Sequence, residues 1–170
     1  DLLFDPLTFT VGSGDATLRD AAVQTLEAIR GIKQALPGVG TILGVSNISF
    51  GLAPASRRVL NSVFLHEAVA AGLDAAIVDA GKVLPLARVA AVDREICLDL
   101  LLDRQREEGK PALMRFIEHF RDAGKQAASE APTEESRTPE EVLFDMVRDG
   151  QKDGLEDQLA ILLRRFAAIA

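Results

Sequence analysis

Three short apolar runs, each closed by a polar residue, constrain the fold of this chain more than any other sequence feature. The runs occupy residues 2–7, 41–47 and 75–81. A brief, continuous apolar run is typical of a buried parallel strand. The polar residues that close the three runs are Asp5, Asn47 and Asp79. Because βα enzymes keep their chemistry at the carboxyl ends of parallel strands, we expect a binding or catalytic site among these side chains.

Segments of helical length separate the runs and carry apolar side chains at helical spacing. The predicted helices span residues 16–36, 54–71 and 84–103. Pro37-Gly38 and Gly72 are stop signals after the first two. Strands alternating with helices across short loops predict an α/β fold with parallel strands and right-handed crossovers. The predicted strands span residues 2–4, 39–45 and 73–78.

The composition changes after residue 103, and residues 104–170 are predicted to form an all-helical tail. Residues 111–123 have one apolar helical face, whereas residues 124–137 are rich in Ala, Ser, Glu and Thr, which is typical of a linker. Thr138-Pro139, followed by two glutamates, is a helix-start signal. Two short helices, 142–148 and 155–169, then predict a helical hairpin that needs a neighbour to bury its apolar face.

Charge and cysteine content exclude several classes of protein. The net charge of −7 and the pI of about 4.9 disfavour partnership with nucleic acid or with an anionic membrane surface. No apolar run approaches the roughly 20 residues of a transmembrane helix, and no basic segment opens a secretory signal. The single cysteine, Cys97, predicts a small buried residue in a reducing, cytoplasmic compartment. No His, Asp and Glu have metal-site spacing, so we expect no metal.

The chemistry of the strand ends leaves alternatives open. Asp5 could accept two hydrogen bonds from a planar donor edge such as an amino-pyrimidinone, or it could stabilise the following turn. Asn47 offers a donor and an acceptor, which suits a ring nitrogen whose protonation changes, but a turn role fits it equally. Asp79 precedes Ala-Gly in a tight turn, so a structural role is favoured there. A helix-packing or surface role is favoured for His66, and a surface role for His119. Arg57-Arg58 could meet an anionic ligand tail, but a solvated face is favoured for them.

Three βα units are too few for a closed (β/α)8 barrel, which takes about 250 residues. They also leave two sheet edges exposed. The chain starts at Asp1, directly at an apolar strand and without an initiator Met. We therefore expect a piece of a longer protein.

Four motifs resemble the pterin-binding domain of the cobalamin-dependent methionine synthases. They are Asp-Pro-Leu at 5–7, Gly-Val-Ser-Asn-Ile-Ser-Phe-Gly-Leu at 44–52, Arg-Val-Leu-Asn-Ser-Val-Phe-Leu at 58–65 and Ala-Ile-Val-Asp-Ala-Gly at 76–81. The resemblance covers about the first hundred residues. It implies the last three βα units of a TIM-type (β/α)8 barrel over residues 1–103, a helix and linker over 104–137, and the start of a helical cobalamin cap over 138–170.

The resemblance also implies a reaction and roles for individual residues. The substrate would be 5-methyltetrahydrofolate, whose methyl group passes to cob(I)alamin on another domain for methionine synthesis. Asp5 would bind the pterin edge, and Asn47 would contact the pterin near N5, whose protonation makes it a better leaving group. Ser46 and Asp79 are further candidates, although the family's pattern has Asn where this chain has Asp79. The implied partners are the missing barrel half and the cobalamin-binding domain, because no Asp-x-His-x-x-Gly motif is present.

The sequence leaves three alternatives open. A corrinoid-protein methyltransferase shares the barrel, but the cap-like tail argues against it. A dihydropteroate synthase would carry a strand-end lysine and a late Arg-x-His, which are absent. The third alternative, from another class, is a non-catalytic half barrel whose exposed edge pairs with a partner chain.

Overall fold

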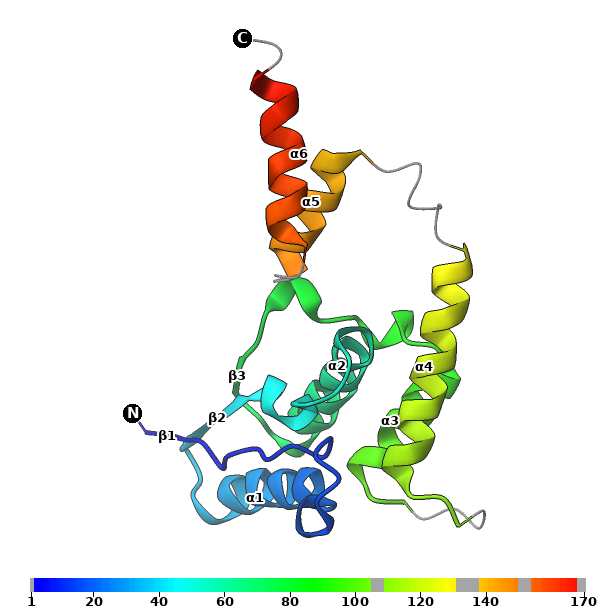
Figure 1. Ribbon diagram of the computed structural model, residues 1–170. Coiled ribbons are helices and arrows are strands. Elements are labelled where there is room, and N and C mark those ends of the chain that lie inside the picture. Colours follow the sequence, from blue (N-terminus) through cyan, green and yellow to red (C-terminus); the bar gives the residue numbers. More distant parts are fainter. Residues whose placement is uncertain (1, 105–108, 131–137, 150–153, 168–170) are drawn as a thin grey trace. The chain divides into compact units, whose positions relative to one another are not determined.

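Three parallel strands lie side by side in the order β1-β2-β3 (Figure 1). They are β1 (Leu3–Phe4), β2 (Gly40–Gly44) and β3 (Ala75–Ile77). This computed structural model describes residues 2–104, 109–130, 138–149 and 154–167. The α/β fold and the parallel pairing predicted from the sequence are confirmed, with each strand shorter than expected.

Helices connect the strands in the predicted order. They are α1 (Ala21–Ala35) between β1 and β2, α2 (Pro54–Ala71) between β2 and β3, and α3 (Ala91–Leu101) after β3. The bounds of α2 are those the sequence predicts. Pro54 occupies the first turn, and Gly72 closes the helix in the left-handed region at φ 108°.

The bounds of four helices differ from prediction, and one of them, α5 (Pro139–Asp149), begins three residues before the predicted start at 142. Asp15 caps only a single 3-10 turn, Ala16–Leu18, so α1 begins at Ala21 rather than at residue 16. After β3 a 3-10 turn, Leu86–Arg88, follows Pro85, and the non-helical backbone at Val89 and Ala90 then delays the start of α3 to Ala91 rather than residue 84. A helix α4 (Ala112–Glu130) continues through the first half of the predicted linker. The rest of that linker, 131–137, lies outside the described residues.

The helices cover one face of the sheet and leave the other open. Thr41 and Leu43 of β2 are fully buried on the helix side, whereas the intervening residues are partly exposed. Strand register places Leu3 beside Gly40 and Ile77 beside Gly44 on the other face, where these two apolar side chains are 56% and 63% exposed. Alternate residues of a strand point to opposite faces. The face away from the helices is therefore apolar and uncovered by any described residue.

An ion pair and a histidine–aspartate contact join α3 to α4. The buried Asp99 accepts from Nη1 of Arg115 at 2.8 Å, and Nη2 of the same arginine donates to the carbonyl of Arg104 at 3.0 Å. His119 Nε2 lies 2.6 Å from Asp93 Oδ1. The surface role favoured for His119 is therefore wrong. Its side chain is only 24% exposed because it turns toward α3.

Cys97 is fully buried on α3, as the sequence predicts. Burial, and next the negative charge of Asp93, raise the pKa of the Cys97 thiol to about 12. The thiol is therefore protonated at neutral pH.

The chain divides into two compact units, Asp1–Lys125 and Gln126–Ala170, with the boundary inside α4. In the second unit, α5 (Pro139–Asp149) packs against α6 (Leu155–Ala167) with Met146 and Leu162 buried between them. Residues 150–153 of the predicted turn lie outside the description. Among the helices that the structure describes, none combines the length and apolarity needed to cross a bilayer.

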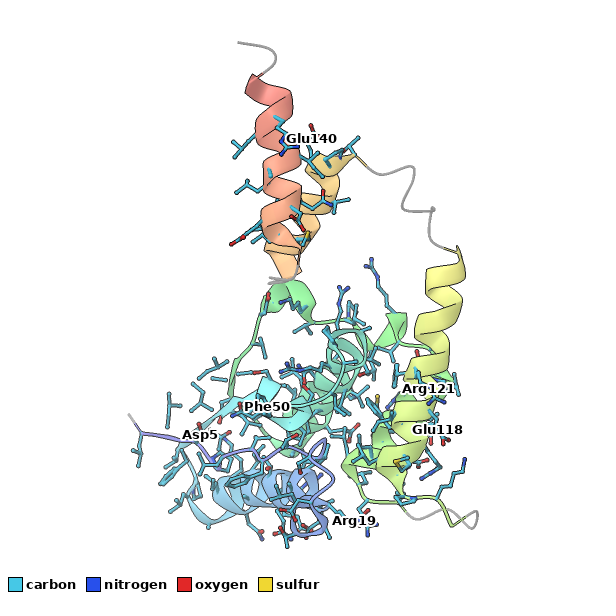
Figure 2. All side chains as sticks on the ribbon, in the orientation of Figure 1. Asp5, Arg19, Phe50, Glu118, Arg121 and Glu140 are labelled. Atoms are coloured by element: carbon cyan, nitrogen blue, oxygen red, sulfur yellow. The ribbon has the colours of Figure 1, made fainter. Side chains whose placement is uncertain are left out.

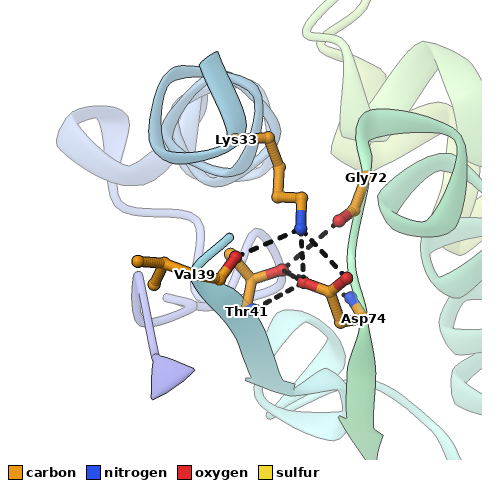
Figure 3. A network of polar contacts seen from close by, with 5 residues as sticks. All are labelled: Lys33, Val39, Thr41, Gly72 and Asp74. Atoms are coloured by element: carbon orange, nitrogen blue, oxygen red, sulfur yellow. Dashed lines mark hydrogen bonds and ion pairs between the residues drawn. The ribbon is translucent and has the colours of Figure 1, made fainter. Parts of the chain in front are cut away.

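A polar network ties α1, β2 and the start of β3 together at the amino ends of the strands (Figure 3). Asp74 accepts from Lys33 Nζ at 2.9 and 3.0 Å and from the backbone N–H of Thr41 at 2.7 Å. Lys33 also donates to the carbonyl of Val39, and Thr41 Oγ1 lies 3.4 Å from the carbonyl of Gly72. The Lys33 hydrogen bond, followed by that of the Thr41 backbone, holds the pKa of Asp74 below its usual value.

We expect Asp74→Asn to lower the thermal unfolding midpoint at neutral pH, because the amide cannot accept as strongly from Lys33. A lowered pKa means that Asp74 stabilises the fold above its unfolded pKa, about 3.9. The contribution is lost as the pH falls through the folded value. Unfolding followed by circular dichroism from neutral to acid pH should show a smaller loss of stability in the variant than in the unaltered chain. Asp20→Asn, on the exposed start of α1, is the control, and identical acid profiles for the unaltered chain and Asp74→Asn would refute the assignment.

Asp99→Asn should destabilise the chain by about 2 kcal/mol, since it weakens a buried, charge-assisted hydrogen bond to Arg115. Arg104→Gln removes an exposed ion pair with Glu95, 3.8 Å long, and should cost less than about 1 kcal/mol. Urea unfolding of both variants measures the difference. Equal costs would mean that burial does not distinguish the two pairs.

Candidate functional site

The loops that follow the three strands emerge at one edge of the sheet, because parallel strands share a direction. The last residue of β1, Phe4, pairs with Thr41, which lies three residues before the end of β2. The last residue of β3, Ile77, pairs with Gly44, the last residue of β2. Asp5 follows β1 directly, and Asp79 follows β3 after one intervening residue. The network around Asp74 lies at the opposite ends of the strands, so it belongs to the scaffold and not to this edge.

Asp5 is exposed and holds its own turn. Its Oδ1 accepts from the backbone N–H of Leu7 at 2.9 Å, and Leu7 has a positive φ of 64°. The carbonyl of Leu7 accepts from Thr25 Oγ1 of α1 at 3.1 Å. The turn role that the sequence left open is therefore present. A carboxylate has about four acceptor positions, so this single bond leaves Asp5 able to accept from a ligand as well.

Asn47 lies in a 3-10 turn, Val45–Ser49, that follows β2 without a break. Its side chain is exposed, and Nδ2 lies 3.5 Å from the point that a β-carbon on Gly44 would occupy. The amide thus folds back toward the end of β2. Within the part of the chain that the structure describes, this amide makes no hydrogen bond, so its donor and acceptor are both available.

Two neighbouring elements hold the turn that carries Asn47. From α2, Arg57 donates through Nε to Ser49 Oγ at 3.1 Å and through Nη2 to the carbonyl of Ser46 at 3.3 Å. From the loop after β1, Val11 N–H donates to the carbonyl of Ile48 at 3.0 Å, and Thr10 Oγ1 lies 2.7 Å from the carbonyl of Phe50. The turn is therefore anchored on both sides of Asn47.

The apolar side chains of this loop divide between core and surface. Ile48 is fully buried, whereas Phe50 is 69% exposed at the end of the turn. Figure 2 labels Phe50 and Asp5, which come from the loops after β2 and β1. Only the outer part of the loop is therefore free to line a pocket or meet a partner.

Asp79 and Ser46 have local structural roles. Asp79 Oδ1 accepts from the N–H of Gly81 at 3.1 Å, and its other oxygen lies 3.3 Å from Lys82 Nζ. Ser46 is exposed, and its carbonyl, rather than its hydroxyl, receives the bonds from Ser49 and Arg57. His66 is exposed on α2, as expected. A search of the described residues finds no group of three or more His, Cys, Asp or Glu able to hold a metal ion.

Arg57 is the residue that the sequence reasoning missed, since a solvated face was favoured for it. One signal was available. Arg57 comes three residues after Pro54, the first residue of α2, where the helix dipole disfavours a positive charge. A cation in that position indicates a compensating contact elsewhere in the fold.

Comparison with known proteins agrees with the resemblance drawn from the motifs. Residues 1–79 match the family described as "Pterin binding enzyme". The chain is 46% identical over 167 residues to "Methionine synthase" of Mycobacterium tuberculosis (strain ATCC 25618 / H37Rv) and 44% identical over 162 residues to that of Mycobacterium leprae (strain TN). Each match covers 93% of this chain and 13% of the relative. The chain thus spans about an eighth of the length of these curated relatives, and the similarity continues beyond residue 79 into its helical part.

Proposed function

We propose that this chain is part of a longer cobalamin-dependent methionine synthase and carries the last three βα units of its pterin-binding barrel. In the whole enzyme, a methyltransferase, the barrel binds 5-methyltetrahydrofolate and its methyl group passes to cob(I)alamin. The observation that carries this proposal is the 46% identity to a methionine synthase over 93% of the chain. The match of residues 1–79 to a pterin-binding family supports the substrate class.

The open face of the sheet supports the incomplete barrel. In a closed barrel, the face away from the helices points inward and is filled by side chains from all the strands. Here Leu3 and Ile77 lie on that face and are more than half exposed, and no described strand pairs with the outer edges of β1 and β3. The further strands of the same enzyme would cover the face and both edges. The same exposed edges also suit the alternative of a non-catalytic half barrel that pairs with a partner chain.

Asp5 is proposed to bind the pterin ring. An ionised carboxylate accepts hydrogen bonds only, and it matches the N–H groups along the amino-pyrimidinone edge of a pterin. The bond from Leu7 to Oδ1 fixes the direction of the carboxylate in advance of binding. Such preorganisation reduces the entropy lost when the ligand is held.

Asn47 is proposed to act at N5 of the pterin. Protonation of N5 makes the tetrahydrofolate amine a better leaving group, so the residue beside N5 must tolerate both protonation states. An amide can do so, because its oxygen accepts from a protonated nitrogen and its NH2 donates to a neutral one. The exposed, unbonded amide of Asn47 suits this task. Ser46 and Asp79 are proposed as secondary contacts at the same edge.

The helical part would extend toward the cobalamin-bearing region. We assign residues 104–137 to a helix and linker and 138–170 to the start of a cobalamin cap. The cofactor itself would be bound by a separate domain and would supply the acceptor for the methyl group. The proposed partners of this chain are therefore the rest of the barrel and that domain, and a cytoplasmic location stays a prediction.

A titration with 5-methyltetrahydrofolate tests the proposal. We expect no binding to the chain alone and binding once the preceding barrel strands are supplied, because those strands complete the site. Native mass measurement of the isolated chain would show whether it pairs with itself through its open edges. Absence of binding in the reassembled barrel would refute the folate proposal and favour the interaction module.

Substitution of Asp5 should affect mainly folate binding, and substitution of Asn47 should affect mainly the rate of methyl transfer. Asp5→Asn should weaken binding about tenfold, since a charged acceptor for the pterin N–H groups is lost. Asn47→Ala should slow methyl transfer by at least about tenfold and change the dissociation constant much less, since its contact matters most when N5 is protonated. Equilibrium titration and single-turnover transfer in the complete enzyme measure both. Asp20→Asn serves as the control, and equal losses of binding and transfer in the two variants would contradict the division of roles.

A further inference from the structure

Asn47 lies between two backbone carbonyls that are each fixed by another element. The carbonyl of Ser46, just before it, receives Nη2 of Arg57 and the hydroxyl of Ser49. The carbonyl of Ile48, just after it, receives the N–H of Val11. The Ile48 carbonyl also accepts from Thr10 Oγ1 at 3.3 Å, so this second anchor comes from the loop after β1. The first anchor is the one that ties the turn to α2.

The first anchor is a closed set of bonds around a buried hydroxyl. Ser49 is 0% exposed, and its Oγ accepts from Nε of Arg57 while donating to the carbonyl of Ser46. The same guanidinium reaches that carbonyl directly through Nη2. A hydroxyl can donate once and accept twice, so the arrangement is chemically consistent. The guanidinium of Arg57 therefore bonds α2 both to the Ser46 carbonyl and to the Ser49 hydroxyl of the turn.

The position of Arg57 makes a purely local role less favourable. A cation in the first turn of α2 interacts unfavourably with the helix dipole. Arg57 nevertheless stands there, and it makes two hydrogen bonds to the turn that carries Asn47. The planar fork of arginine can hold two acceptors at once, which the single ammonium of lysine cannot do with the same geometry. The bonds therefore use the property in which arginine differs from lysine.

We propose that Arg57 is a positioning residue that, through Ser49 and the Ser46 carbonyl, fixes the turn carrying Asn47 in its productive orientation. The inference rests on the proposed function, because it assigns Asn47 the task at N5. Arg57 itself does not touch the pterin. It acts only by limiting the motion of the backbone that displays the amide, which must be held closely for efficient transfer.

Hydrogen exchange of the complete enzyme, without folate, tests the anchor itself. In Arg57→Met the amides of Phe50 and Leu52, which donate to the carbonyls of Asn47 and Ser49, should exchange about tenfold faster, as expected for loss of a charge-assisted hydrogen bond. Arg57→Lys should give a smaller increase, because one of the two bonds can re-form. Arg58→Lys is the matched control, since the neighbouring arginine bonds to the Lys82 carbonyl on another loop, and it should leave residues 46–52 unchanged.

Methyl transfer tests whether the anchor acts through Asn47. Arg57→Met should slow single-turnover transfer by about tenfold with little change in folate affinity, and Arg57→Lys should restore part of the rate. In an Asn47→Ala background the same Arg57 substitutions should have no further effect. A merely structural role for Arg57 would slow transfer by the same factor in both backgrounds.

The outcomes are distinguishable. Unchanged exchange at residues 46–52 overturns the inference, whatever the transfer rate. Faster exchange combined with an undiminished effect of Arg57→Met in the Asn47→Ala background also overturns it. Absence of methyl transfer from 5-methyltetrahydrofolate in the unaltered enzyme instead overturns the proposed function and the task of Asn47 with it.

Discussion

Parallel pairing of β1, β2 and β3 is the constraint on which the rest of the first unit depends. Parallel neighbours need a crossover connection, and crossovers of one hand place α1 and α2 on the same face of the sheet. The other face then has no helix of its own, although its residues are apolar. Exposure of Leu3 and Ile77 follows directly from this geometry. The same constraint gathers the three strand exits at one edge, so the incomplete core and the candidate site have a single cause.

The two ends of the strands are built in different ways. At the amino ends, Asp74, Lys33 and Thr41 satisfy one another through short bonds that tie β2 to α1 and to the start of β3 (Figure 3). At the carboxyl ends, the candidate side chains Asp5 and Asn47 are exposed. The backbone that carries Asn47 is held by Arg57, and Asp5 uses one oxygen for a single bond within its own turn. Stability is thus concentrated away from the edge where a ligand would bind, which leaves the side chains of that edge free to serve chemistry.

Features encoded locally were predictable from the sequence, and features that depend on distant contacts were not. Gly72 marks the end of α2 because few other residues adopt its backbone conformation. Pro85 signals a break just before this region, but the apolar spacing after it concealed the non-helical backbone at Val89 and Ala90 that delays α3. The parallel-strand rule placed Asp5 and Asn47 at one edge, yet it could not show that one carboxylate oxygen is already engaged. The bonds of Arg57 span eight and eleven residues of sequence and a change of element. The position of this cation early in α2 signals a contact, but it does not identify the atoms that Arg57 binds.

The state of Cys97 has a practical consequence for solution studies of this protein. A thiol that is fully buried, with a pKa raised to about 12, is nearly inert toward alkylating probes at neutral pH. It is the only cysteine in the 170 residues. A cysteine introduced at exposed Phe50 would therefore take up a fluorophore or spin label selectively, with no need to remove the native thiol first. The chain is in effect already prepared for site-directed spectroscopy of the loop that carries Asn47.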